Sequence, residues 1–219
     1  MLNDAIRMIA AALCGEEKQI TIQVTPHPAL GSVNLLLLQL AAHSEISVSG
    51  EAHITPIPRT PDVSSPRFGT LPRELFFLFA GLCAKLNLVM QVNAVEEGVT
   101  ADELNELSEA MGGVLVYAIR KNRIILSSFT YSEGLRADVS VPGAFAAGLL
   151  LGACMSERDT VFYLESYASS PAVIAAVSAI NGSGGSAEET GDKLTVSTLR
   201  DRFDKKTGRR FRKRNEPCS

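Results

Sequence analysis

Three cysteines recur at almost equal intervals along the chain, and this interval limits the folds that the chain can adopt. Cys14, Cys83 and Cys154 are 69 and 71 residues apart. Each of them closes an apolar stretch rich in Ala and Leu, which predicts a helix. The predicted helices cover residues 4–14, 72–83 and 142–154. A fixed period of this length indicates internal repeats, so the 219 residues divide into three similar units.

A similar order of elements follows each cysteine: a strand, a second helix and two closing strands. The strands cover 19–24, 88–95 and 159–166, and the second helices cover 29–42, 100–112 and 170–182. The closing pairs cover 45–50 with 52–57, 113–120 with 123–131, and 184–191 with 193–198. A strand precedes the first helix at 67–71 and 136–141, and the first copy lacks this strand.

The ends of the second helices carry capping signals. Thr100 and Ser170 are predicted N-caps, and Glu103 stands three residues after Thr100, as a capping box requires. Gly112 and Gly182 are predicted C-cap glycines.

The repeated order predicts an α/β (α+β) fold made of three βαβαββ units, at about 1–58, 66–132 and 135–198. Such units cannot each bury a core alone, so we expect a single domain over residues 1–199. In that domain the helices are buried around a pseudo-threefold axis and the sheets lie outside.

The stretch 143–155 is apolar on all sides, which is typical of a buried helix. Gly148 and Gly152 within it allow a neighbouring helix to come close. With only four cysteines in the chain and no metal-ligand spacing, we interpret the three spaced ones as small core residues.

The net charge of -3 conceals an asymmetry. Residues 200–219, the basic C-terminal segment, hold nine basic and three acidic residues, which leaves about -9 for residues 1–199. The candidate nucleic-acid contacts in this segment are Arg209, Arg210, Arg212, Lys213 and Arg214. Clustered Lys and Arg bind phosphates; the alternative is a solvated, disordered terminus.

The longest apolar run, 143–155, is 13 residues long, which is short of the ~20 that a membrane-spanning helix needs. Neither a signal peptide nor a lipoprotein site is recognisable at the start of the chain. We therefore expect a cytoplasmic protein with no membrane partner. His27, His43 and His53 fall in different predicted elements, so no metal site is predicted.

Two further patterns favour ordinary structural roles. Asn181 to Gly185 is rich in glycine but runs from a helix into a strand, whereas phosphate loops run from strand to helix. We interpret it as a helix end and turn. The acidic residues of 100–112 are interpreted as a solvated helix face, and they are Asp102, Glu103, Glu106 and Glu109.

Two segments are similar to members of the enolpyruvate transferase family, whose fold is shared with RNA 3′-terminal phosphate cyclases. Residues 7–14, RMIAAALC, resemble the end of a conserved segment of EPSP synthase (3-phosphoshikimate 1-carboxyvinyltransferase), with Arg7 in the place of its arginine. Residues 138–177 resemble the segment between two ligand-binding helix starts of that family. The matching positions there are Phe145, Asp159, Thr160, Val161, Ser169 and Pro171.

The chain departs from that family where the family binds its ligands. The Lys-Ser pair and Arg of the family's first helix have no counterpart, and its Ser-Ser-Gln reads Pro142-Gly143-Ala144. Its Tyr after Ser-x-Pro is Ala172, and the sequence around His27 replaces its arginine for phosphoenolpyruvate. The second domain of the family, which completes the cleft, has no counterpart in this chain.

The resemblance implies an EPSP synthase-like domain without independent catalysis, with no catalytic residue and no cofactor. We expect it to bind a phosphorylated or carboxylated small molecule, or to pair with another chain or a second copy. Arg7 and Ser169 are the candidate substrate-binding residues. One alternative is an RNA-associated protein of the cyclase-like branch that uses the basic C-terminal segment. Another is an active enolpyruvyl transferase whose cleft is completed by oligomerisation.

Overall fold

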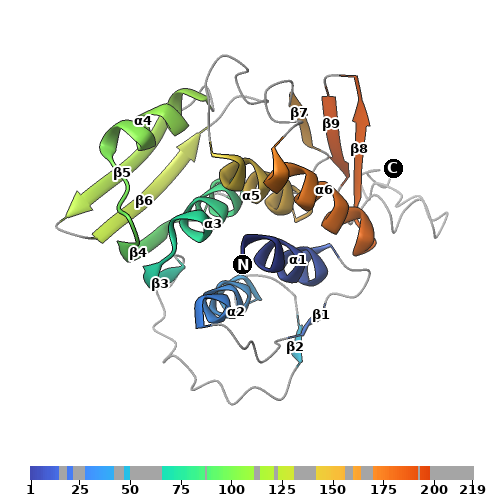
Figure 1. Cartoon of the computed structure of the whole chain (residues 1–219), viewed down its shortest axis with the longest axis horizontal. Coiled ribbons are helices and arrows are strands. Elements are labelled where there is room, and N and C mark those ends of the chain that lie inside the picture. Colours follow the sequence, from blue (N-terminus) through green and yellow to red (C-terminus); the bar gives the residue numbers. More distant parts are fainter. Residues whose placement is uncertain are drawn as a thin grey trace, which may run out of the picture.

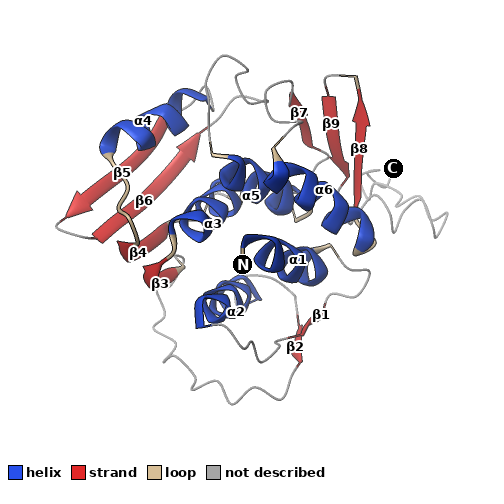
Figure 2. Ribbon diagram, in the orientation of Figure 1, coloured by secondary structure: helices blue, strands red, loops and turns tan. Residues whose placement is uncertain are grey.

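A computed structural model describes residues 1–14, 19–21, 28–41, 47–49, 66–86, 88–110, 114–120, 123–130, 142–155, 160–163, 170–191 and 193–197. These residues form a mixed α and β structure of helices and small sheets, which agrees with the predicted α+β class (Figure 1). Most of the helices gather in the middle of the molecule, and the strands lie towards its outside with one helix, residues 101–110, beside them (Figure 2). In the described part of the chain, no helix is long and apolar enough to cross a membrane.

Every predicted helix is present, with its ends shifted by a few residues. The helices are α1 (Leu2–Leu13), α2 (Pro28–Ala41), α3 (Arg73–Lys85), α4 (Ala101–Ala110), α5 (Gly143–Ala153) and α6 (Pro171–Gly182). The strands are β1 (Gln19–Thr21), β2 (Ser47–Ser49), β3 (Arg67–Leu71), β4 (Met90–Val95), β5 (Val114–Arg120), β6 (Arg123–Thr130), β7 (Thr160–Tyr163), β8 (Ser186–Thr190) and β9 (Lys193–Ser197). The predicted strands 52–57 and 136–141 and the basic C-terminal segment lie outside the described residues.

The sheets of the second and third segments are built alike. The four-stranded sheet has the order β3-β4-β6-β5, and the three-stranded sheet has the order β7-β9-β8. In the four-stranded sheet, β6 pairs antiparallel with both β4 and β5. In the three-stranded sheet, β9 pairs antiparallel with both β7 and β8 in the same way. In the first segment, β1 instead pairs directly and in parallel with β2.

The core is formed by apolar helices rather than by a sheet sandwich. Helices α3 and α5 pack along one another, α6 packs on α5, and α1 contacts both α5 and α6 (Figure 1). All residues from Leu75 to Ala84 of α3 and from Ala144 to Ala153 of α5 are buried. The burial predicted from the apolar stretch 143–155 is therefore confirmed for α5, because every side of this helix contacts other parts of the protein.

Glycines bring α3 and α5 into backbone contact. A Cβ on Gly148 would lie within 3.0 Å of the carbonyl oxygen of Leu78, and a Cβ on Gly81 within 3.0 Å of that of Phe145. A Cβ on Gly152 would lie 2.8 Å from the Lys85 side chain. Real Cβ atoms do not come this close, so the close approach predicted at Gly148 and Gly152 is confirmed and Gly81 completes it from α3.

The three spaced cysteines are core residues, as predicted. Cys14, Cys83 and Cys154 are at most 2% exposed, and all three are thiols. Burial raises the pKa of the Cys83 thiol to about 12, so this group stays protonated and unreactive at neutral pH.

Side-chain amides secure two sheet edges to helices. The Arg67 N–H of β3 donates to Gln39 Oε1 of α2 at 2.8 Å, and Gln39 Nε2 donates to the Arg67 carbonyl at 3.4 Å. At β8, the Ala187 N–H donates to Asn181 Oδ1 at 2.8 Å, and Asn181 Nδ2 donates to the Ala187 carbonyl at 3.0 Å. Each amide thus takes the place that a further strand would occupy.

The end of α6 differs in detail from the sequence prediction. Gly182 is still helical, and the cap residue is Ser183. The left-handed conformation falls on Gly184, with φ of 88°, and the Gly185 N–H donates to the Ile180 carbonyl at 2.8 Å. The predicted C-cap at Gly182 is therefore wrong, whereas the helix end and turn predicted over residues 181–185 are confirmed.

Candidate anion-binding site

The starts of helices α5 and α6 lie against one another. Gly143 is the first residue of α5, and a Cβ at this position would overlap Oγ of Ser170, the N-cap residue of α6. The two helices pack together along their length as well. The lack of a side chain at Gly143 therefore leaves room for the Ser170 hydroxyl at the meeting of the two helix starts.

Each of the two adjoining helix starts has backbone N–H groups without a partner in its own helix. In an α-helix the first N–H groups have no partner within the helix, and the helix dipole makes this end positive. Gly143 and Ala144 of α5 and Ala172 and Val173 of α6 hold these positions. The Ser170 hydroxyl makes no capping hydrogen bond to its helix, although it is the N-cap residue. The arrangement suits a carboxylate or phosphate.

The same site is poor in groups that could perform chemistry. Residues 142–144 and 170–172 carry no ionisable side chain. Proton transfer needs a positioned acid or base, and charge neutralisation needs Arg or Lys. The two helix starts therefore do not themselves supply a catalytic group.

The structure locates one of the two predicted substrate-binding residues. Arg7 is exposed on α1, the helix that packs against α5 and α6. Ser169 lies outside the described residues, directly before the N-cap Ser170. The basic residues proposed to contact nucleic acid also lie outside them: Arg209, Arg210, Arg212, Lys213 and Arg214.

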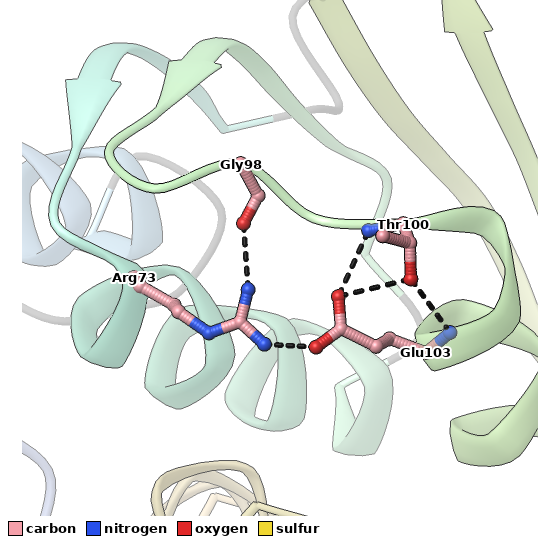
Figure 3. Close-up of polar contacts among 4 residues, drawn as sticks. All are labelled: Arg73, Gly98, Thr100 and Glu103. Carbon is pink, nitrogen blue, oxygen red and sulfur yellow. Dashed lines mark hydrogen bonds and ion pairs between the residues drawn. The ribbon is translucent and has the colours of Figure 1, made fainter.

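A polar network around Arg73 was not predicted from the sequence. Arg73 begins α3, and its guanidinium donates to the Gly98 carbonyl at 2.6 Å and forms an ion pair with the Glu103 carboxylate (Figure 3). The guanidinium also lies 5.1 Å from the centre of the Phe77 ring. The network joins α3 to the loop before α4, and both charged side chains are about 30% exposed.

Glu103 belongs to a capping box at the start of α4, as its spacing from Thr100 predicted. Glu103 Oε2 accepts from the Thr100 N–H at 2.8 Å and from its hydroxyl at 3.1 Å, and the Glu103 N–H donates to Thr100 Oγ1 at 3.3 Å (Figure 3). Partial burial alone would raise the pKa of Glu103, but the hydrogen bonds from Thr100 and Arg73 and the Arg73 charge lower it below its usual value.

These contacts correct the interpretation of the acidic helix face. Asp102, Glu106 and Glu109 are exposed, as a solvated face requires. Glu103 is instead bonded to Thr100 and Arg73 and has a structural role. The capping box could be predicted because Thr100 and Glu103 are only three residues apart. Arg73 is 30 residues away from Glu103, and no pattern in the sequence indicates that these two side chains are in contact.

Metal binding has no support in the described residues, where no group of three or more His, Cys, Asp or Glu side chains could hold an ion. His27, His43 and His53 lie outside those residues.

A comparison of the sequence with models of known protein families finds no match, and a comparison with curated proteins finds none either.

Proposed function

We propose that this chain is an EPSP synthase-like domain that binds a small phosphorylated or carboxylated molecule and does not itself catalyse enolpyruvyl transfer. The observation that carries the proposal is the meeting of the α5 and α6 starts at Gly143 and Ser170. These are the two helix starts that bracket the segment resembling the family. Their N–H groups suit an oxyanion.

The proposal includes an architecture of three βαβαββ units around a pseudo-threefold axis. Its support is the equal order and direction of β4-β6-β5 and β7-β9-β8, together with the burial of Cys14, Cys83 and Cys154 near the ends of α1, α3 and α5. Buried thiols are also compatible with a reducing compartment, and we propose the cytoplasm as the location.

The lack of catalysis follows from the side chains at the proposed site. Where the family has Ser-Ser-Gln, this chain has Pro142-Gly143-Ala144, and where the family has Tyr it has Ala172. Hydrogen bonds to charged groups contribute about 1.5–3 kcal/mol each, so their loss weakens both binding and transition-state stabilisation. The resemblance to the family makes Arg7 the charged side chain that binds the ligand. We propose that a second copy or another chain completes the cleft.

The binding part of the proposal is tested with Ser170→Asp. Aspartate is a good N-cap, so α6 is expected to keep its stability, while the new carboxylate competes with an anion for the same N–H groups. Phosphoenolpyruvate and shikimate 3-phosphate are expected to raise the Tm of the unchanged chain. That increase should disappear in Ser170→Asp and become smaller in Arg7→Ala.

Ser170→Ala is the matched control, because it removes the hydroxyl and leaves the N–H groups of the helix start in place. It should keep most of the ligand-induced increase in Tm. An increase that persists unchanged in Ser170→Asp would contradict the site. Phosphate release from phosphoenolpyruvate and shikimate 3-phosphate at high protein concentration would contradict the absence of catalysis.

A further inference from the structure

The outer face of the four-stranded sheet is hollowed between β3 and β4. The hollow has a volume of about 360 Å³ and is lined by Arg67, Phe68, Gln91 and Asn93. Arg67 stands opposite Gln91 in the parallel pair, and side chains alternate along a strand. Arg67, Gln91 and Asn93 therefore share one face of the sheet. The side chains of Phe68 and Val92 are buried.

Beside the hollow, β3 has a residue without a side chain. Gly69 lies between two β3 residues that pair with the neighbours of Asn93, so Gly69 stands opposite Asn93 on the face that carries Arg67. A Cβ at Gly69 would have no neighbour within 4 Å. Glycine weakens the interior of a strand and often marks a place where a ligand comes close to the backbone.

The floor of the hollow is held in place from two sides. The Arg67 backbone is bound through both its N–H and its carbonyl by the Gln39 amide of α2. The Phe68 ring packs against the Phe79 ring of α3, with their centres 5.1 Å apart. Because the backbone on which Arg67 stands is fixed, less order has to be gained when a ligand binds.

The lining residues select a class of ligand by charge. Among the described lining residues Arg67 is the one ionisable side chain, and its planar guanidinium matches a carboxylate with two parallel hydrogen bonds. A single positive charge balances a single negative charge, and the described lining residues include no carboxylate that would receive an ammonium group. The amide of Asn93 offers both a donor and an acceptor, which suit hydroxyl groups.

We propose that this hollow binds a small hydroxy carboxylic acid. The carboxylate lies on Arg67, a hydroxyl group bonds to the amide of Asn93, and the carbon chain passes over Gly69. This site is on the outer face of a sheet and is separate from the helix starts of the proposed function, so neither proposal depends on the other.

The test is an NMR titration of the full chain with gluconate, followed through the backbone amide signals. Gluconate is expected to shift the signals of residues 67–70 and 91–93 with saturation in the millimolar range. Glucose, which has the hydroxyl groups without the charge, should leave them unchanged. The hydroxy-acid assignment is overturned if gluconate shifts none of these signals, if glucose shifts them equally, or if inorganic phosphate binds there more tightly than gluconate.

Three variants locate the binding. Arg67→Gln removes the charge and should weaken gluconate binding at least about tenfold, since charged hydrogen bonds contribute about 1.5–3 kcal/mol and 1.4 kcal/mol is tenfold. Asn93→Asp should repel the acid to a similar extent. Gly69→Val fills the hollow, and because valine favours strands the Tm should not fall.

Thr70→Val is the matched control for Gly69→Val, since it puts the same side chain at the next residue of β3, which pairs with Ala94 and does not stand opposite Asn93. It should bind gluconate as the unchanged chain does. Full binding by both Arg67→Gln and Gly69→Val would overturn the proposal. Ser170→Asp should leave gluconate binding intact, so failure at the helix starts and failure at this hollow can be told apart.

Discussion

At the scale of single residues, glycines determine how closely the helices pack. Gly148→Ala would push a Cβ against the Leu78 carbonyl, which belongs to rigid backbone and cannot turn aside. Overpacking of this kind costs about 1–3 kcal/mol, and we expect the free energy of unfolding to fall by this amount in urea denaturation. Gly31→Ala in α2 is the control: its Cβ meets nothing within 4 Å, so helix propensity should raise the stability by about 0.5–1 kcal/mol. Equal effects of the two substitutions would contradict the close contact between α3 and α5.

At the scale of elements, the capping box and the Arg73 ion pair fix the start of α4. The lowered pKa of Glu103 means that its ionised form stabilises the fold. This contribution is present above the unfolded-state pKa of about 4.3 and is lost as the pH falls through the lower folded-state pKa. Glu103→Gln keeps a capping side chain but loses the charge, so it should be less stable by roughly 0.2–1 kcal/mol at pH 7. The difference should vanish near pH 2 in urea denaturation, and Glu106→Gln, one turn away and exposed, should show none at either pH.

The elements also show what the sequence could and could not predict. The helices and the capping box were predictable because their signals are local: apolar periodicity, and Thr100 followed by Glu103. The direct pairing of β1 with β2 and the contact of Arg73 with Glu103 were not, because they join residues about 30 positions apart in the chain. The hollow at Gly69 was also hidden, since it appears only when the register of β3 on β4 shows which side chains share a face.

At the scale of the whole molecule, the repeat predicts that the third segment has the full strand set of the second. In the second segment β3 is the edge strand and pairs in parallel with β4. The three-stranded sheet ends at β7, the counterpart of β4. The sequence predicts a strand at 136–141, and a repeat architecture requires it to pair in parallel with β7. The amides that point toward β7 should then be protected from hydrogen exchange, in alternation along the segment.

Native-state hydrogen exchange measured by NMR tests this prediction, with β3 as the internal reference. Protection of alternate amides in 136–141, comparable with that in residues 67–71, would support the equivalence of the second and third units. Uniform fast exchange in 136–141 beside a protected β3 would contradict the repeat in its third copy. Val139→Pro removes an N–H donor inside the predicted strand and should abolish the protection of its neighbours, whereas a solvated segment would exchange at the same rate with or without the substitution. The outcome separates a true repeat from two sheets that share an order of strands by coincidence.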